Sequence, residues 1–138
     1  NDRVDAGDVG AGHTVTALYE ITLNDELRYQ EKNAGPGKYN DELALLKIRY
    51  KRPDESASRE MVHAVSKMEI RDRLADNSDN FRFSAAVAGF GQLLRNSQFI
   101  EGYSYEEVYA LAEKSRGEDS FGYRSEFLQL VKLAGSLK

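Results

Sequence analysis

The stretch FRFSAAVAGFGQLLR, residues 81–95, decides the class of fold, because its apolar residues recur with the period of a helix. Ser78 or Asp79 is the expected N-cap, and the helix is expected to run to about Asn96. Small residues between the apolar ones would allow a neighbouring element to approach closely. One apolar stripe stands at positions i, i+4, i+7 and i+11 of this helix: Phe83, Val87, Phe90 and Leu94.

Two further helices are expected after this one. The second begins with the capping box Ser104-Tyr-Glu-Glu107 and is expected to end at Gly117. Its inward-facing residues are expected to be Val108, Leu111 and Ala112. The third helix begins between Ser120 and Gly122, with this stripe: Tyr123, Phe127, Leu130, Val131, Ala134 and Leu137. Short links between three amphipathic helices predict a small bundle, packed on itself or on one face of a sheet.

The chain before these helices has the two-residue period of β-strands. Three strands are expected: Thr14–Leu23, Leu43–Lys51 and Met61–Ile70. The linker over residues 52–60 is short enough for the last two to form an antiparallel hairpin. The first strand has an apolar face: Val15, Ala17, Tyr19, Ile21 and Leu23. The sequence therefore predicts an α+β fold in a single domain over residues 1–138, with a β half at about 1–70 and a helical half at about 78–138.

The composition narrows the classes of function. The chain has 138 residues, no cysteine and a net charge of −4. An acidic chain is a poor ligand for nucleic acid or an anionic membrane, since both repel negative charge. The lack of cysteine excludes disulfides, zinc–thiolate sites and thiol nucleophiles. No apolar run approaches the roughly 20 residues of a membrane span. Because the chain starts at Asn1 without a methionine, we expect it to be a fragment of a longer protein.

The first candidate site is the glycine-rich segment from Asp5 to His13, which also contains Asp8. Two carboxylates and an imidazole this close are able to hold a divalent metal ion or act as acid and base, so a metal-dependent hydrolase is one hypothesis. The competing interpretation is a tight turn that leads into the first strand, because glycine and aspartate are common turn residues. A phosphate loop is disfavoured, since the segment precedes a strand and not a helix.

The second candidate is Asp54-Glu-Ser56-Ala-Ser58, which matches the D-x-S-x-S string of a metal-ion-dependent adhesion site. Such a site follows a buried parallel strand and opens a helix, whereas this string lies between two hairpin strands. A solvated hairpin loop is therefore the favoured interpretation. His63 alternates with the apolar residues of its strand and is expected to face solvent or a neighbouring layer.

The third candidate is a group of aromatic residues around the second helix: Tyr103, Tyr105, Tyr109 and Tyr123, with Phe99 and Phe121 nearby. Of these, Tyr103, Tyr105 and Tyr109 are the candidate binding residues. Tyrosine is common at protein interfaces, because it combines a large apolar area with a polar tip. Packing within the helical bundle is the competing explanation, and it is favoured. No residue is expected to be catalytic.

Four segments together resemble the C-terminal region of bacterial von Willebrand factor type A domain-containing proteins of the YfbK type. These are Asp5–Glu20, Glu42–Lys51, Phe81–Arg95 and Gly122–Ala134. The resemblance implies an upstream type A domain that carries the genuine metal site, so Asp54, Ser56 and Ser58 do not inherit that role. It also implies further upstream strands, which would make the β half part of a sandwich-like sheet.

The resemblance also sets the expected function. Proteins of this family are expected to be exported, often as lipoproteins, which suggests the periplasm or cell envelope. The chain is then expected to be a non-catalytic accessory or protein-interaction domain that needs no cofactor. Its expected partners are the upstream type A domain, another envelope protein, or a second copy bound through exposed strands.

Overall fold

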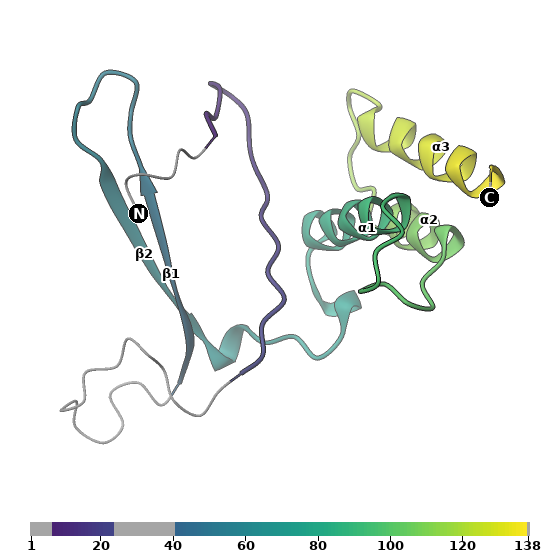
Figure 1. The fold of residues 1–138 in the computed structure, drawn as a ribbon, viewed down its shortest axis with the longest axis horizontal. Coiled ribbons are helices and arrows are strands. Elements are labelled where there is room, and N and C mark those ends of the chain that lie inside the picture. Colours follow the sequence, from purple (N-terminus) through teal and green to yellow (C-terminus); the bar gives the residue numbers. More distant parts are fainter. Residues whose placement is uncertain (1–6, 24–40, 138) are drawn as a thin grey trace. The chain divides into compact units, whose positions relative to one another are not determined.

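The computed structural model describes residues 7–23 and 41–137 (Figure 1). The chain divides into two compact units. One unit comprises the residues up to Tyr19 together with those from Arg73 onward, and the other runs from Glu20 to Asp72. That the chain forms a single domain stays a prediction.

The second unit contains an antiparallel β-hairpin, as the sequence predicts. Strand β1 spans Glu42–Tyr50 and strand β2 spans Arg59–Ser66. Leu46 lies opposite His63, and Ile48 lies opposite Met61. The register shifts between Glu42 and Ala44, near the start of β1. Since cross-strand partners share a face of a sheet, this register fixes which side chains lie together.

The prediction of about three strands is wrong by one. Residues 14–23 are extended but belong to no strand, and the sheet of the described residues contains β1 and β2 alone (Figure 1). The alternation of apolar and polar residues in Thr14–Leu23 is that of a strand, but a strand also needs a neighbour that accepts its backbone hydrogen bonds.

The predicted strand Met61–Ile70 ends earlier, at Ser66. Ser66 and Glu69 form a capping box around the short 3-10 helix Lys67–Glu69. The Ser66 hydroxyl accepts from the N–H of Met68 at 3.2 Å, and the Ser66 N–H donates to Glu69 at 2.7 Å. These local bonds satisfy the backbone in place of a strand ladder, which is why the strand stops there.

All three predicted helices are present in the first unit. Helix α1 spans Asp79–Leu94, α2 spans Tyr105–Lys114 and α3 spans Tyr123–Ser136. A second short 3-10 helix, Leu74–Asp76, precedes α1. The predicted caps are confirmed: Ser78 caps α1, and Ser104 with Glu107 forms a capping box on α2. Helix α2 ends before Gly117, which was expected to end it.

The core of the described residues lies among the three helices, with α2 packed against both α1 and α3. Its fully or nearly fully buried apolar residues are Ala86, Val108, Ala112, Leu128 and Val131. The ring of Phe127 on α3 meets two rings of α1 edge to face, that of Phe83 at 5.4 Å and that of Phe90 at 5.3 Å. Edge-to-face ring pairs of this kind stabilise the folded protein by more than the burial of their apolar area alone. The helical bundle therefore packs on itself.

The inward stripe predicted for α3 is only partly right. Val131 is fully buried and Phe127 packs on the core, but Tyr123, Leu130 and Leu137 are exposed. Leu128, outside the predicted stripe, is buried instead. Apolar residues cover more than one face of α3, and periodicity alone does not say which face meets the neighbouring helices.

Candidate interaction surfaces

The glycine-rich candidate segment is a turn at its described end. The N–H of His13 donates to the carbonyl oxygen of Gly10 at 3.1 Å, and Gly12 has a φ of 76°. A positive φ at this third position of a four-residue turn favours glycine. His13 Nδ1 lies 3.1 Å from the carbonyl oxygen of Ala11, so the tautomer protonated there donates back to its own turn.

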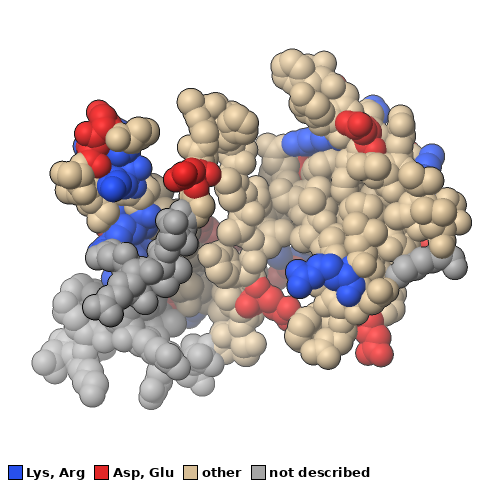
Figure 2. Space-filling model, turned by 45° about the horizontal axis from the view of Figure 1, so that its top comes forward, with Lys and Arg blue, Asp and Glu red and all other residues tan. Residues whose placement is uncertain are grey.

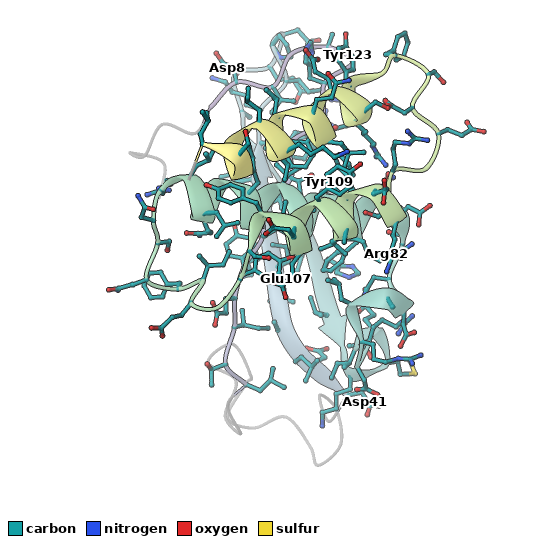
Figure 3. The ribbon with its side chains drawn as sticks, turned by 90° about the vertical axis from the view of Figure 1, so that its right-hand side faces the viewer. Asp8, Asp41, Arg82, Glu107, Tyr109 and Tyr123 are labelled. Carbon is teal, nitrogen blue, oxygen red and sulfur yellow. The ribbon has the colours of Figure 1, made fainter. Side chains whose placement is uncertain are left out.

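The turn leaves the metal hypothesis without support in the described residues. Asp5 lies outside them, while Asp8 and His13 are exposed (Figure 3 labels Asp8). Over residues 7–23 and 41–137, no three His, Asp or Glu side chains gather closely enough to hold a metal ion. The hydrolase that would use Asp5, Asp8 and His13 stays a prediction.

The adhesion-site string lies in the loop between β1 and β2, as predicted. The N–H of Glu55 donates to the carbonyl oxygen of Arg52 at 3.1 Å, which closes a turn. Arg59 Nε donates to the Glu55 carboxylate at 2.7 Å. Asp54, Ser56 and Ser58 thus belong to a hairpin loop with its own local bonds.

His63 is exposed, as predicted, but the register places it on the apolar face of the hairpin opposite Leu46. Its Nε2 lies 3.5 Å from Glu69 Oε1. The backbone hydrogen bond from Ser66, assisted by His63, holds the pKa of the Glu69 carboxyl below its usual value.

The three candidate tyrosines pack against the helical core. The Tyr103 ring lies over Gly89 of α1, where an added Cβ would come within 2.9 Å of Cε1. Burial raises the pKa of the Tyr103 hydroxyl, and the charge of Glu107 adds to this. The Tyr105 ring meets Phe90 edge to face at 6.1 Å. Packing between helices, the favoured interpretation, therefore accounts for both rings.

Tyr109 lies on α2, between residues of two helices (Figure 3). Its hydroxyl donates to Glu113 Oε1 at 3.0 Å, and Lys132 Nζ of α3 lies 4.5 Å from its ring centroid. The cation–π attraction between Lys132 and the Tyr109 ring helps to hold α3 against α2. Tyr103 and Tyr105 thus pack against α1, whereas Tyr109 contacts α3 through Lys132.

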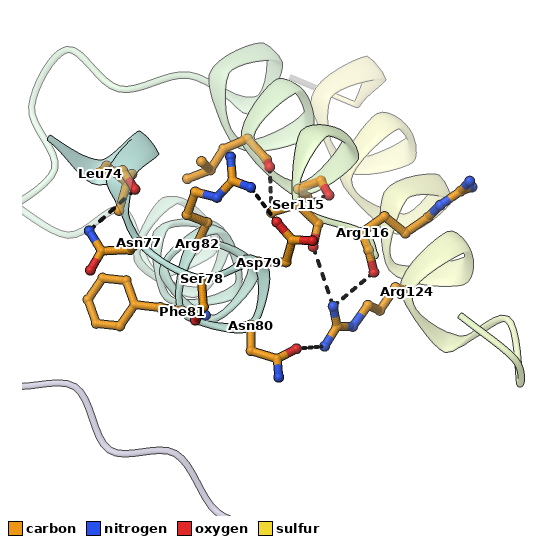
Figure 4. Close-up of polar contacts among 12 residues, drawn as sticks. Leu74, Asn77, Ser78, Asp79, Asn80, Phe81, Arg82, Ser115, Arg116 and Arg124 are labelled. Carbon is orange, nitrogen blue, oxygen red and sulfur yellow. Dashed lines mark hydrogen bonds and ion pairs between the residues drawn. The ribbon is translucent and has the colours of Figure 1, made fainter. Parts of the chain in front are cut away.

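Sequence reasoning missed a polar network at the link between α2 and α3 (Figure 4). The guanidinium of Arg124 donates to the carbonyl oxygens of Ser115, at 3.3 Å, and Arg116, at 2.8 Å, and to Asn80 Oδ1 at 2.6 Å. It also stacks on the Phe83 ring at 4.6 Å. One side chain therefore holds the start of α1, the end of α2 and the start of α3 together.

Asp119 supplies the cap that α3 lacks at Gly122. Its carboxylate accepts from the N–H of Arg124 at 3.1 Å and from the N–H and hydroxyl of Ser125, both at 2.8 Å. Burial would raise the pKa of Asp119, but these hydrogen bonds and the charge of Arg116 together lower it. The network is structural, since its members satisfy one another.

Exposed apolar side chains are the feature that these contacts leave unexplained. On the hairpin, Leu46 and Ile48 are each 40% exposed and Met61 is 52% exposed. On α3, Leu130 and Leu133 are more than half exposed. The Phe121 and Tyr123 rings stack at 6.1 Å in the open. Figure 2 shows charged side chains in small separate groups between wider uncharged areas on one face.

A hollow within the first unit adds a smaller apolar surface. It is lined by Thr16 and Leu18 of the extended segment and by residues of α1: Phe83, Ser84, Val87 and Ala88.

In the described part of the chain, no helix is long and apolar enough to cross a membrane.

Comparison with known proteins gives one family. A family described as "Uncharacterized protein YfbK, C-terminal" matches residues 1–137. The chain is 40% identical over 141 residues to the "Uncharacterized protein YfbK" of Escherichia coli (strain K12), over 97% of this chain and 24% of that relative. It thus spans about a quarter of the relative's length. No solved structure matches. As the sequence resemblance predicts, the chain belongs to the family of YfbK C-terminal domains.

Proposed function

We propose that this chain is a non-catalytic accessory domain that binds another protein surface through the apolar face of its β-hairpin. The register β1–β2 collects one set of side chains on that face: Ala44, Leu46, Ile48, Tyr50, Arg59, Met61, His63 and Val65. The opposite face carries three charged residues, Lys47, Arg49 and Glu60, beside the apolar Leu45, Val62 and Ala64. An exposed apolar face on a two-stranded sheet is the observation that carries the proposal, because such a sheet is marginally stable alone.

The proposed partner is the upstream part of the same polypeptide. The matched region makes up 24% of the relative YfbK, which leaves about three quarters of that protein to provide a partner surface. The resemblance implies a von Willebrand factor type A domain there, in a protein of the periplasm or cell envelope.

Calorimetric titration of this chain with the separately produced upstream part of a YfbK-type protein tests the proposal. Met61→Asp and Val62→Asp form a matched pair, since both residues are 52% exposed and they lie on opposite faces of β2. Met61→Asp is expected to weaken binding about tenfold or more, because it puts a charge into the apolar contact. Val62→Asp is expected to bind as the unsubstituted chain does.

Two results would count against the proposal: no binding while both parts are folded, or equal loss of affinity in the two variants. A titration repeated with and without Mg²⁺ tests the link to a metal-bearing type A domain. Affinity that depends on Mg²⁺ would support that domain as the partner.

A further inference from the structure

One residue on the apolar face of the hairpin belongs to the type that changes its charge near neutral pH. His63 is one of two histidines in the chain, and histidine ordinarily gains or loses its proton between pH 5 and 8. The register places it on the apolar face, opposite Leu46. The other ionisable residues of this face, Tyr50 and Arg59, are a tyrosine and an arginine, which ordinarily keep one charge over that range. The charge of the apolar face therefore depends on the proton of His63.

A carboxylate lies beside this imidazole. His63 Nε2 is 3.5 Å from Glu69 Oε1, and the other oxygen of Glu69 accepts from the Ser66 N–H at 2.7 Å. This second bond belongs to the capping box at the end of β2, so the carboxylate is held in place. The hydrogen bond from Ser66, and after it the contact with His63 and the charge of Arg71, lower the pKa of the Glu69 carboxyl. A negative charge therefore stays beside His63 at neutral and mildly acidic pH.

The surroundings of His63 differ between the face and the turn. On the face, its neighbours in the register are apolar: Ala44, Leu46, Ile48, Met61 and Val65. The charged groups of the turn are Lys67, Glu69 and, just after it, Arg71, and of these Glu69 contacts His63. The side chain of His63 is 60% exposed. Water and Glu69 therefore both stabilise the imidazolium while the face is free.

We infer that His63 makes protein binding at this face depend on pH: the face binds while the imidazole is neutral, and protonation of His63 opposes binding. The inference rests on the proposed function, because it concerns the regulation of the same face. A partner that covers the face takes water away from His63, and a charge loses far more free energy than a neutral imidazole does when it leaves water.

Glu69 does not cancel this cost. Burial of an ion pair removes water from both of its members, and the attraction between them often fails to repay that loss. The neutral imidazole keeps a partner, since the tautomer protonated at Nε2 faces the Glu69 carboxylate. Binding below the ordinary pKa of histidine therefore releases one proton, and the affinity falls as the pH falls.

Calorimetric titration against the separately produced upstream part of a YfbK-type protein, repeated from about pH 7.5 to about pH 5.5, tests the inference. A histidine with the ordinary pKa of about 6.5 is about one-tenth protonated at the upper pH and about nine-tenths at the lower. The affinity of the unsubstituted chain is therefore expected to fall about tenfold over this range. His63→Gln puts a neutral amide at the same place and is expected to remove this fall.

The second histidine of the chain provides the matched control. His13 lies in the glycine-rich turn and outside the hairpin, and its N–H donates to Gly10. His13→Gln is expected to keep the tenfold fall in affinity. Groups of the partner titrate equally in every experiment, so a difference between the two variants belongs to His63.

The outcomes separate this inference from the proposed function. Binding that Met61→Asp weakens, but whose pH profile is the same in the unsubstituted chain and in His63→Gln, would overturn the inference and leave the proposed function standing. A fall that His13→Gln removes as fully as His63→Gln does would also overturn it, as would affinity that rises towards low pH through His63. No binding at any pH, while both parts are folded, would remove the proposed function and the inference with it.

Discussion

Gly89 lets the Tyr103 ring come close to helix α1, and adding one methyl group tests this contact. In Gly89→Ala the new Cβ would lie 2.9 Å from Tyr103 Cε1 and 3.5 Å from Val108 Cγ2. The first distance is well inside van der Waals contact. Gly91, two residues along the same helix, has no atom within 4 Å of its added Cβ. Gly91→Ala is therefore a matched control for helix propensity alone.

The two substitutions are expected to have different effects on the free energy of unfolding. Alanine is favoured over glycine inside a helix by about 0.5–1 kcal/mol, so Gly91→Ala should stabilise by about that amount. Gly89→Ala gains the same stabilisation from helix propensity, but its methyl group overpacks the contact with the Tyr103 ring, which costs about 1–3 kcal/mol. Gly89→Ala should therefore be less stable than Gly91→Ala by about 1–3 kcal/mol.

Urea unfolding followed by circular dichroism measures both values. The responsible contact is identified in a Tyr103→Ala background, where the ring is gone and Gly89→Ala should become nearly as stabilising as Gly91→Ala. If Gly89→Ala and Gly91→Ala stabilise the unsubstituted chain equally, the close packing of Tyr103 on α1 is refuted. If the penalty persists without the ring, the clash lies elsewhere, with Val108 as the next neighbour.

Three further predictions concern the caps and the link between α2 and α3. Ser104→Ala removes the hydroxyl that accepts from Glu107 N–H and should lower the free energy of unfolding by about 1 kcal/mol in urea titrations, while Ser136→Ala at the end of α3 should change it less. Because the native pKa of Asp119 is lowered, its contribution to stability is present above its unfolded pKa and is lost as pH falls through the native value. Melting temperatures measured below about pH 4 should thus fall less steeply for Asp119→Asn than for the unsubstituted chain, and equal slopes would argue against the cap. Arg124→Lys keeps the charge but cannot reach Ser115, Arg116 and Asn80 together, so it should destabilise by about 1–2 kcal/mol. A variant as stable as the unsubstituted chain would show that the three contacts are dispensable.

The features that the sequence predicted well are local ones. Ser78 and the pair Ser104 and Glu107 lie within one helical turn of the groups they cap, so a few letters suffice to recognise them. The capping box at Ser66 and Glu69 is equally local, but it lies inside an apolar alternation that predicts a longer strand.

The features that it missed depend on contacts between distant residues. Arg124 bonds to Asn80, which lies 44 positions away, and no short motif announces such a pair. Likewise, the alternation in Thr14–Leu23 is that of a strand, but pairing is a property of two segments. The family was identified correctly because the matching segments are long and occur in order along the chain. The resemblance assigned no role to any residue of the candidate sites.

The distribution of apolar residues connects these observations with the proposed interactions. The buried apolar residues of the described chain all come from the three helices, whereas apolar side chains of residues 14–23 are exposed and those of the hairpin are exposed or half-buried. Scattered exposed apolar residues are normal, but those of the hairpin share one face and those of residues 14–23 alternate along one segment. The outer residues of α3 are also apolar, yet the helix satisfies its own backbone, so a partner there would gain only side-chain burial. At a sheet or an extended segment, a partner can gain side-chain burial and a backbone ladder together. For this reason, binding should be sought first at the hairpin and at residues 14–23, and only afterwards at α3.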